Sequence, residues 1–283
     1  MSTINRQPIS SLLHPTDFSK SGETAFVHAL KIAVCNQSNF DILHVGPGNS
    51  KGATWEKFPQ VRQTLEHWNL LEEGSSRKAV GEVLGINVRK LDLKNRNPIT
   101  AMLEFFERDE CDLIVLSTEG RSGLPRWLKP SVSESLARGT GVPTLFVPWN
   151  VNGFVSYETG EVNLERVLIP VDHKPHPQDA IEFAGRFLNS INAELTRLDA
   201  FYVGDNSNRP EIKAPSTMKA PFDLIVRHGD PVDEILKMAK EQQTGLIVMA
   251  TEGHNGFLDA LRGSTTEQIL RHSPCPVLAV PQL

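Results

Sequence analysis

A short strand, a loop of small residues and a helix start follow one another between residues 246 and 270, and together they have the chemistry of an anion site. The apolar run at residues 246–250 is typical of a strand that is buried on both faces. Ser264 is a good N-cap residue, and Glu267 stands three positions after it, as in a capping box. Because the free N–H groups and the positive dipole end of such a helix attract anions, most often phosphate, the pattern predicts a phosphate site.

The spacing of the small residues in this loop narrows the prediction, since a strand, a loop and a capped helix also occur in α/β folds that bind nothing. Ala250 is followed after two residues by Gly253, and after nine more by Gly263 and Ser264. This spacing resembles the nucleotide-binding loop of the ATP-binding universal stress proteins, in which glycine, two residues, glycine, nine residues and a third glycine precede serine or threonine. Only the first glycine differs, because alanine replaces it here.

Length, composition and charge exclude several classes of protein. The 283 residues, 39% of them apolar, suit two soluble domains. The net charge of −5 provides no basic field that would attract nucleic acid or an anionic membrane. The chain has no apolar run of transmembrane length, and its first ten residues lack the apolar segment of a signal peptide, so a cytoplasmic protein is expected. Cys35, Cys111 and Cys275 lie scattered in apolar contexts and are expected to be reduced packing residues.

Strands alternate with helices along the first half of the chain, which indicates parallel βαβ units. The expected strands are one that ends before Pro15 and those at residues 40–45, 86–93, 112–116 and 143–147. The expected helices lie at residues 24–34, 55–71, 98–108 and 131–138.

The same pattern then repeats in the second half. Residues 230–232, 246–253 and 276–281 each match a segment that lies 133 positions earlier, whereas Asp172 matches Asp17, which lies 155 positions earlier. The second copy is therefore 22 residues shorter, and the loss falls where the first copy has its helix at residues 55–71.

The segment at residues 206–221 replaces that helix, and its proline, asparagine and serine content predicts a mobile loop that leaves one flank of the second sheet open. Between the copies, an alternating pattern around a Glu-Thr-Gly turn predicts a linking hairpin. The expected division is thus one domain at residues 1–149, a hairpin at residues 150–165 and a second domain at residues 166–283.

Both copies resemble universal stress protein domains, and together they span nearly the whole chain. The resemblance implies an α/β fold of two tandem five-stranded parallel-sheet domains with strand order 3-2-1-4-5, of the adenine-nucleotide alpha-hydrolase-like type. Family members pair through the last strand, so the two copies are expected to pair there around an internal pseudo-two-fold axis. Ligands of such sheets bind beyond the carboxyl ends of strands one and four.

Carried over by position, the resemblance implies a nucleotide site in the second copy. Adenine is expected against Pro170, Val171 and Val203, with Asp172 near the base and ribose. Met249 and Ala250 are expected to line the base and sugar. The residues expected to hold the phosphates are Gly253, Gly263, Ser264, Thr265 and Thr266.

The corresponding site of the first copy is degenerate. Its expected residues are Pro15, Thr16, Asp17, Val45, Ser117, Gly120, Pro130 and Ser131. Ser117 stands where the family has its first glycine, and Pro130 stands where it has its third. Because proline has no N–H to donate and its ring fills the space that glycine leaves open, the first copy is expected to bind weakly or not at all.

The resemblance implies an adenine-nucleotide-binding stress-response or regulatory protein. Enzymes that use ATP on a similar sheet carry HIGH, KMSKS-like or SGGxDS signatures, and none of these is present, so no catalytic residue is assigned. Slow ATP hydrolysis and a ligand-free structural dimer or scaffold stay open as alternatives.

The expected ligand is ATP, ADP or AMP, with Mg²⁺ beside the phosphates left open, and the expected partners are an unidentified protein and further copies of the chain. His173, His176, His228 and His254 gather near the proposed ligand end. They lack the paired spacing and the cysteines of a zinc site, so no metal site is predicted.

Overall fold

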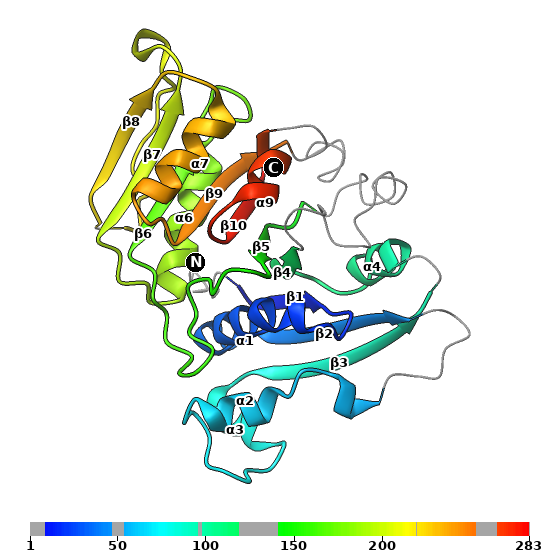
Figure 1. The fold of residues 1–283 in the computed structure, drawn as a ribbon. Coiled ribbons are helices and arrows are strands. Elements are labelled where there is room, and N and C mark those ends of the chain that lie inside the picture. The colour runs from blue at the N-terminus through cyan, green and yellow to red at the C-terminus, as the bar shows by residue number, and fades with distance from the viewer. Residues whose placement is uncertain are drawn as a thin grey trace, which may run out of the picture.

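The two halves of the chain form one continuous sheet. The structure, a computed structural model, describes residues 9–46, 54–95, 98–118, 141–218, 220–252 and 265–282. Within these residues the sheet has ten strands in the order β3-β2-β1-β4-β5-β10-β9-β6-β7-β8. Counted along its own part of the chain, each half therefore has the predicted order 3-2-1-4-5. Figure 1 shows the first half in blue to green and the second in yellow-green to red, with β5 and β10 between them.

The strands and helices follow the predicted alternation. The elements of the first half are β1 (Ser11–Pro15), the 3-10 turn η1 (Lys20–Gly22), α1 (Glu23–Asn36), β2 (Asn39–Gly46), η2 (Trp55–Lys57), α2 (Val61–His67), α3 (Ala79–Leu84), β3 (Asn87–Lys94), α4 (Pro98–Phe106), β4 (Leu113–Thr118) and β5 (Thr144–Pro148). Those of the second half are β6 (Arg166–Pro170), α6 (Gln178–Ser190), β7 (Arg197–Val203), η4 (Asn206–Asn208), β8 (Phe222–Arg227), α7 (Pro231–Glu241), β9 (Leu246–Thr251), α9 (Thr265–His272) and β10 (Val277–Pro281). The helix predicted at residues 131–138 lies outside the described residues.

The last strands of the two halves pair with each other. Strand β10 runs antiparallel to β5, with Leu278 opposite Leu145 and Ala279 opposite Thr144. The neighbouring strands inside each half are parallel. A single antiparallel contact between two parallel half-sheets is the arrangement that a pseudo-two-fold axis requires, so the predicted pairing is confirmed.

Helices α1 and α6 cover the same face of the sheet and share one hydrophobic core. They contact each other directly, and the core joins Phe40 on β2 to Phe187 on α6. Figure 1 shows α1 against the strands of the first half and α6 against those of the second. Smaller clusters fill the opposite face, one under α4 and one under α7 and α9. The three cysteines are free thiols, and burial raises the pKa of Cys111 and Cys275 to about 12, as suits packing residues.

The segment that links the halves folds back on itself and packs against the first half. Val155 and Val162 form an antiparallel bridge, as a hairpin requires. Phe154 lies between the two halves, with its ring centroid 4.6 Å from that of His28 on α1 and 6.5 Å from that of Phe187 on α6. The indole Nε1 of Trp68 donates a hydrogen bond to the carbonyl oxygen of Tyr157 at 2.8 Å.

The long helix predicted at residues 55–71 is wrong. The chain instead forms the turn η2, an extended Phe58 and then the short helix α2. The cause is Pro59, because the residue before a proline is driven out of the helical region, and Phe58 has ψ of 150°. Asn69, with φ of 56°, follows the end of α2, and α3 was not predicted.

The segment between β7 and β8 contains only the turn η4 among its described residues, in agreement with the predicted loss of a helix. The segment lies across α6, and hydrogen bonds join the two. The backbone N–H of Lys213 donates to Gln178 Oε1 at 3.0 Å, and Asn189 Nδ2 donates to the Thr217 carbonyl oxygen at 2.6 Å. Ile212 and Met218 pack on the core. This segment therefore packs on α6, and the more open flank of the second sheet stays a prediction.

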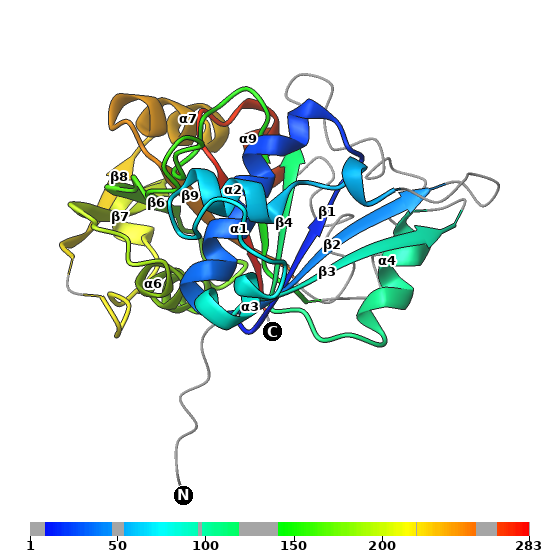
Figure 2. The ribbon, with the colours of Figure 1, turned by 90° about the horizontal axis from the view of Figure 1, so that it is seen from below.

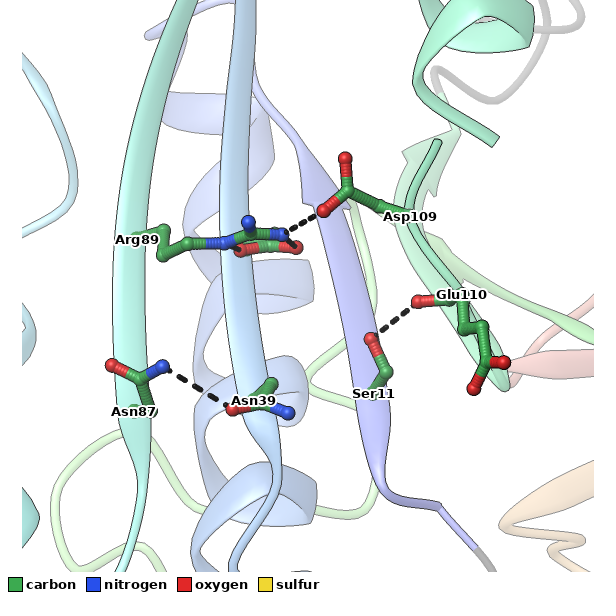
Figure 3. Close-up of polar contacts among 7 residues, drawn as sticks. Ser11, Asn39, Asn87, Arg89, Asp109 and Glu110 are labelled. Atoms are coloured by element: carbon green, nitrogen blue, oxygen red, sulfur yellow. Dashed lines mark hydrogen bonds and ion pairs between the residues drawn. The ribbon is translucent and has the colours of Figure 1, made fainter. Parts of the chain in front are cut away.

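An arginine on the edge strand of the first half binds a buried carboxylate on the neighbouring strand. Arg89 on β3 binds Asp41 on β2 through Nε and Nη2, both at 2.6 Å, and its Nη2 also reaches Asp109 at 2.8 Å. The Asp41 side chain is 2% exposed and that of Arg89 is 43% exposed. Figure 3 shows Arg89 reaching across β2 toward Asp109. These hydrogen bonds, donated by Arg89 first to Asp41 and then to Asp109, raise the pKa of Arg89.

Candidate functional site

A cavity of about 340 Å³ opens beyond the carboxyl ends of β6 and β9. The chain leaves β6 toward β7 and leaves β9 toward β10, on the other side, so this is the topological switch point of the second half. The predicted site residues that line it are Pro170, Val171, Asp172, Val203, Met249, Ala250, Thr265 and Thr266. The other three predicted residues, Gly253, Gly263 and Ser264, lie outside the described residues.

The walls of this cavity are apolar where strand residues reach it. Phe201 and Val203 on β7 point to the face covered by α7, and Ile235 on α7 closes the cavity from that side. Met249 on β9 is buried beside them. Flat, apolar walls of this kind suit an aromatic ring.

The loop after β6 brings charged groups to the same cavity. The backbone N–H of Val171 donates to the Phe201 carbonyl oxygen at 2.9 Å, which fixes the start of the loop against β7. Asp172 is exposed, and its Oδ1 accepts a hydrogen bond from the His173 N–H at 2.7 Å. Among the described lining residues, Lys174 is the single cation and Asp172 and Glu252 are the carboxylates. Lys174 was not predicted from the sequence.

Thr251 is a second residue that the sequence analysis missed. It is the last residue of β9, is 4% exposed and lines the cavity. Its Oγ1 has no hydrogen-bond partner within the described part of the chain, and the same is true of Thr118 at the end of β4. A buried hydroxyl without a partner costs free energy that a bound ligand would recover. The Thr-Glu-Gly triplet that the two copies share was the signal that could have identified both threonines.

Helix α9 begins at the rim of the cavity. Thr265 and Thr266, its first two residues, line the cavity. In the same turn, Glu267 forms an ion pair with Arg271, which ties the first turn to the second. The first described turn of α9 thus lies beside the same space as Lys174 and Thr251.

The corresponding region of the first half is arranged differently. Pro15, at the end of β1, pairs with Leu43 on β2, and Asp17 Oδ1 accepts the Ser19 N–H at 2.9 Å within its own loop. Ser117 Oγ donates to the Ser21 carbonyl oxygen at 2.6 Å and so joins the end of β4 to η1. Ala250, its counterpart in the second half, has no hydroxyl to form this link.

The other predicted residues of the first site fall into two groups. Thr16 Oγ1 accepts the Phe18 N–H at 3.1 Å, and Val45 packs in the cluster under α4. Gly120, Pro130 and Ser131 lie outside the described residues.

The histidines near the cavity have separate partners. A hydrogen bond of 2.7 Å joins His173 Nε2 to the Asn208 carbonyl oxygen, and His176 Nδ1 accepts the Gln178 N–H at 3.4 Å. His254 lies outside the described residues. Within the described residues, no group of three or more His, Cys, Asp or Glu side chains is arranged to hold a metal ion. In the same residues, each helix is too short or too polar to cross a membrane.

Comparisons with known proteins agree with this fold. The profile described as the universal stress protein family matches residues 9–148 and 219–281, more than half of the chain, and the chain belongs to that family. Universal stress protein Rv2005c of Mycobacterium tuberculosis is 23% identical over 268 residues, which cover 83% of this chain and 85% of that protein.

Solved structures of similar fold also span both halves. A universal stress protein from Archaeoglobus fulgidus aligns with a TM-score of 0.59 at 18% identity and covers 96% of this chain and 98% of its own. The functionally unknown protein PA1789 from Pseudomonas aeruginosa aligns with a TM-score of 0.57 at 15% identity and covers 98% of this chain and 94% of its own.

Proposed function

We propose that the second half binds one adenine nucleotide in the cavity at the ends of β6 and β9, and that its occupancy regulates how the protein associates. One observation carries the proposal. The described residues that the resemblance implies come from four separate parts of the chain, yet all of them line this one cavity.

The lining residues divide into groups that match the parts of a nucleotide. Val171, Val203 and Met249 offer apolar surface to the base, and Asp172 offers a carboxylate to a ribose hydroxyl. Thr265 and Thr266 offer N–H and hydroxyl groups to phosphate oxygens at the start of α9. The loop glycines Gly253 and Gly263 would complete this phosphate end, as the resemblance implies.

Lys174 and Thr251 add to the proposed site. Lys174 supplies a positive charge beside an anion, which is a role that the loop glycines cannot fill. Thr251 also lines the cavity, and its buried hydroxyl has no hydrogen-bond partner among the described residues.

The first half is proposed to bind the nucleotide weakly or not at all. The hydrogen bond from Ser117 to Ser21 closes the end of β4 against the turn that precedes α1. Pro130 stands where the second copy has Gly263 and has no N–H to donate.

Filling the cavity tests the proposal, and the pseudo-symmetry supplies a matched control. Val203→Trp places a large ring against the base position, so the affinity for ATP in calorimetric titration is expected to fall roughly tenfold or more. Val45→Trp makes the same change at the corresponding position of the first half and is expected to leave the affinity unchanged. Thermal melting of both variants checks that each remains folded. Equal affinity in the two variants would show that the nucleotide does not bind in this cavity.

Several finer points remain predictions from the sequence. They are the choice among ATP, ADP and AMP, Mg²⁺ beside the phosphates, a cytoplasmic location, an unidentified protein partner and a homo-oligomer.

A further inference from the structure

A second cavity, of about 430 Å³, lies in the part of the first half that has no counterpart in the second. It is bounded by η2, α2, α3 and the edge strand β3, and α3 packs directly on β3. Figures 1 and 2 show α2 and α3 together beside this edge strand. We call this cavity the edge groove. Its apolar floor includes Val80 and Val88, which pack with the core.

The edge groove is strongly cationic on an acidic protein. Its described lining includes Arg62, Arg77, Lys78 and Lys90 but a single carboxylate, that of Glu56, whereas the whole chain has a net charge of −5. Arg62 is engaged, because Nη1 donates to the Ser75 carbonyl oxygen at 2.9 Å and Nε lies 3.4 Å from Glu66. No ion pair joins the other three cations to a carboxylate within the described residues.

Two of these cations are held beside an exposed tryptophan. Trp55 is 54% exposed. The centre of its ring lies 5.6 Å from the Arg77 guanidinium carbon and 5.4 Å from Lys90 Nζ. Lys90 Nζ also lies 5.9 Å from the centre of the Phe58 ring. These cation–π contacts hold the two charges in the groove without neutralising them.

Lys90 is partly buried in the groove and lies close to the charge of Arg77. Burial, and then the neighbouring charge of Arg77, lower the pKa of Lys90, while Glu56 offsets this only in part. A bound anion would relieve both the repulsion and the loss of solvation.

We propose that the edge groove binds a small organic polyanion that carries at least two phosphate groups, at a site separate from the nucleotide cavity. Guanidinium and ammonium groups together favour phosphate oxygens, because arginine donates a planar fork and lysine a point charge. Several separate cations match several charged groups, and the volume falls within the range of about 300–1,000 Å³ that small-molecule sites occupy. The apolar floor of Val80 and Val88 offers a surface to the organic part of such a ligand.

Inorganic pyrophosphate is the probe, and calorimetric titration of the Lys174→Gln variant removes the single cation among the described residues that line the nucleotide cavity. One pyrophosphate per chain is expected, with an affinity that falls about tenfold in Lys90→Gln and in Arg77→Gln, as the loss of one charge-assisted hydrogen bond predicts. Lys240→Gln, on the exposed part of α7, is the matched control and is expected to change nothing. Pyrophosphate should also alter tryptophan fluorescence, and Trp55→Phe should remove that change while binding persists.

Three results would overturn the proposal. One is pyrophosphate affinity that is the same in Lys90→Gln, Arg77→Gln and Lys240→Gln. Another is the loss of all binding in the Lys174→Gln variant, which would place the ligand in the nucleotide cavity. The third is equal affinity for inorganic phosphate and pyrophosphate, which would show a site for a single anionic group.

Discussion

Replacing Arg89 with methionine is expected to lower the free energy of unfolding by about 3 kcal/mol, at the lower end of the range for a buried carboxylate that loses its partner. The reason is Asp41, whose side chain is 2% exposed and whose two oxygens both accept hydrogen bonds from Arg89. The lower end applies because Arg89 is itself 43% exposed and water can reach part of the gap. Urea unfolding at neutral pH measures the change.

A double variant separates the loss of a partner from the loss of packing. Asp41→Leu combined with Arg89→Met removes both charges, so most of the lost stability is expected to return. If the double variant is as unstable as Arg89→Met alone, the buried charge is not the cause and this explanation fails.

Stability is expected to fall steeply as the pH drops from about 7 to about 5, and His28 is a principal cause. Its Nε2 accepts hydrogen bonds from the N–H groups of Phe154 at 2.9 Å and Val155 at 3.2 Å. Because these backbone groups can only donate, the ring proton must lie on Nδ1, which is 2.7 Å from the Thr24 carbonyl oxygen. Protonation of Nε2 would therefore break both links between α1 and the segment that joins the halves.

The sign of this pH dependence follows from the pKa of His28. Burial lowers it from 6.5 to about 4, although the hydrogen bond to Thr24 acts in the opposite direction. The unfolded chain thus takes up a proton at higher pH than the folded chain, and the stabilisation that is complete above about pH 6.5 is lost as the pH falls toward about 4. From pH 7 to pH 5 the loss from this one histidine is about 2 kcal/mol.

Urea unfolding at both pH values tests the role of His28. His28→Leu is expected to be less stable at pH 7, because two buried N–H groups lose their acceptor, and its loss of stability between the two pH values should be about 2 kcal/mol smaller. His67→Leu, which changes an exposed histidine on α2, is the control and should keep the pH dependence of the unmodified protein. An unchanged pH dependence in His28→Leu would refute the assignment.

The order of the strands and the described residues of the candidate site were predictable because the chain repeats local patterns that resemble a known family. Strand ends such as Pro170 and Asp172 recur as Pro15 and Asp17, and a helix start is marked by Asn97 before Pro98 in the first copy and by Asp230 before Pro231 in the second. The structure shows Asp230 accepting the N–H groups of Val232 and Asp233 at 2.9 and 3.1 Å, as an N-cap does.

Contacts between distant parts of the chain were not predictable in the same way. Asp41 interrupts an apolar strand, and only the register that places Arg89 opposite it reveals the partner. His28 looks like one more residue of an amphipathic helix, yet its partner Phe154 lies 126 positions away. The break at Phe58 and Pro59 was visible in the sequence, because a proline inside a helical pattern ends the helix at the preceding residue.

The central claim is that the chain binds one adenine nucleotide and that the second half holds it. Calorimetric titration of the unmodified protein with ATP tests this most directly, because it measures affinity and stoichiometry together. The account predicts one nucleotide per chain, in a cavity whose phosphate end includes Thr265 and Thr266, with any second site at least about tenfold weaker. Two equal sites per chain, or none, would contradict it.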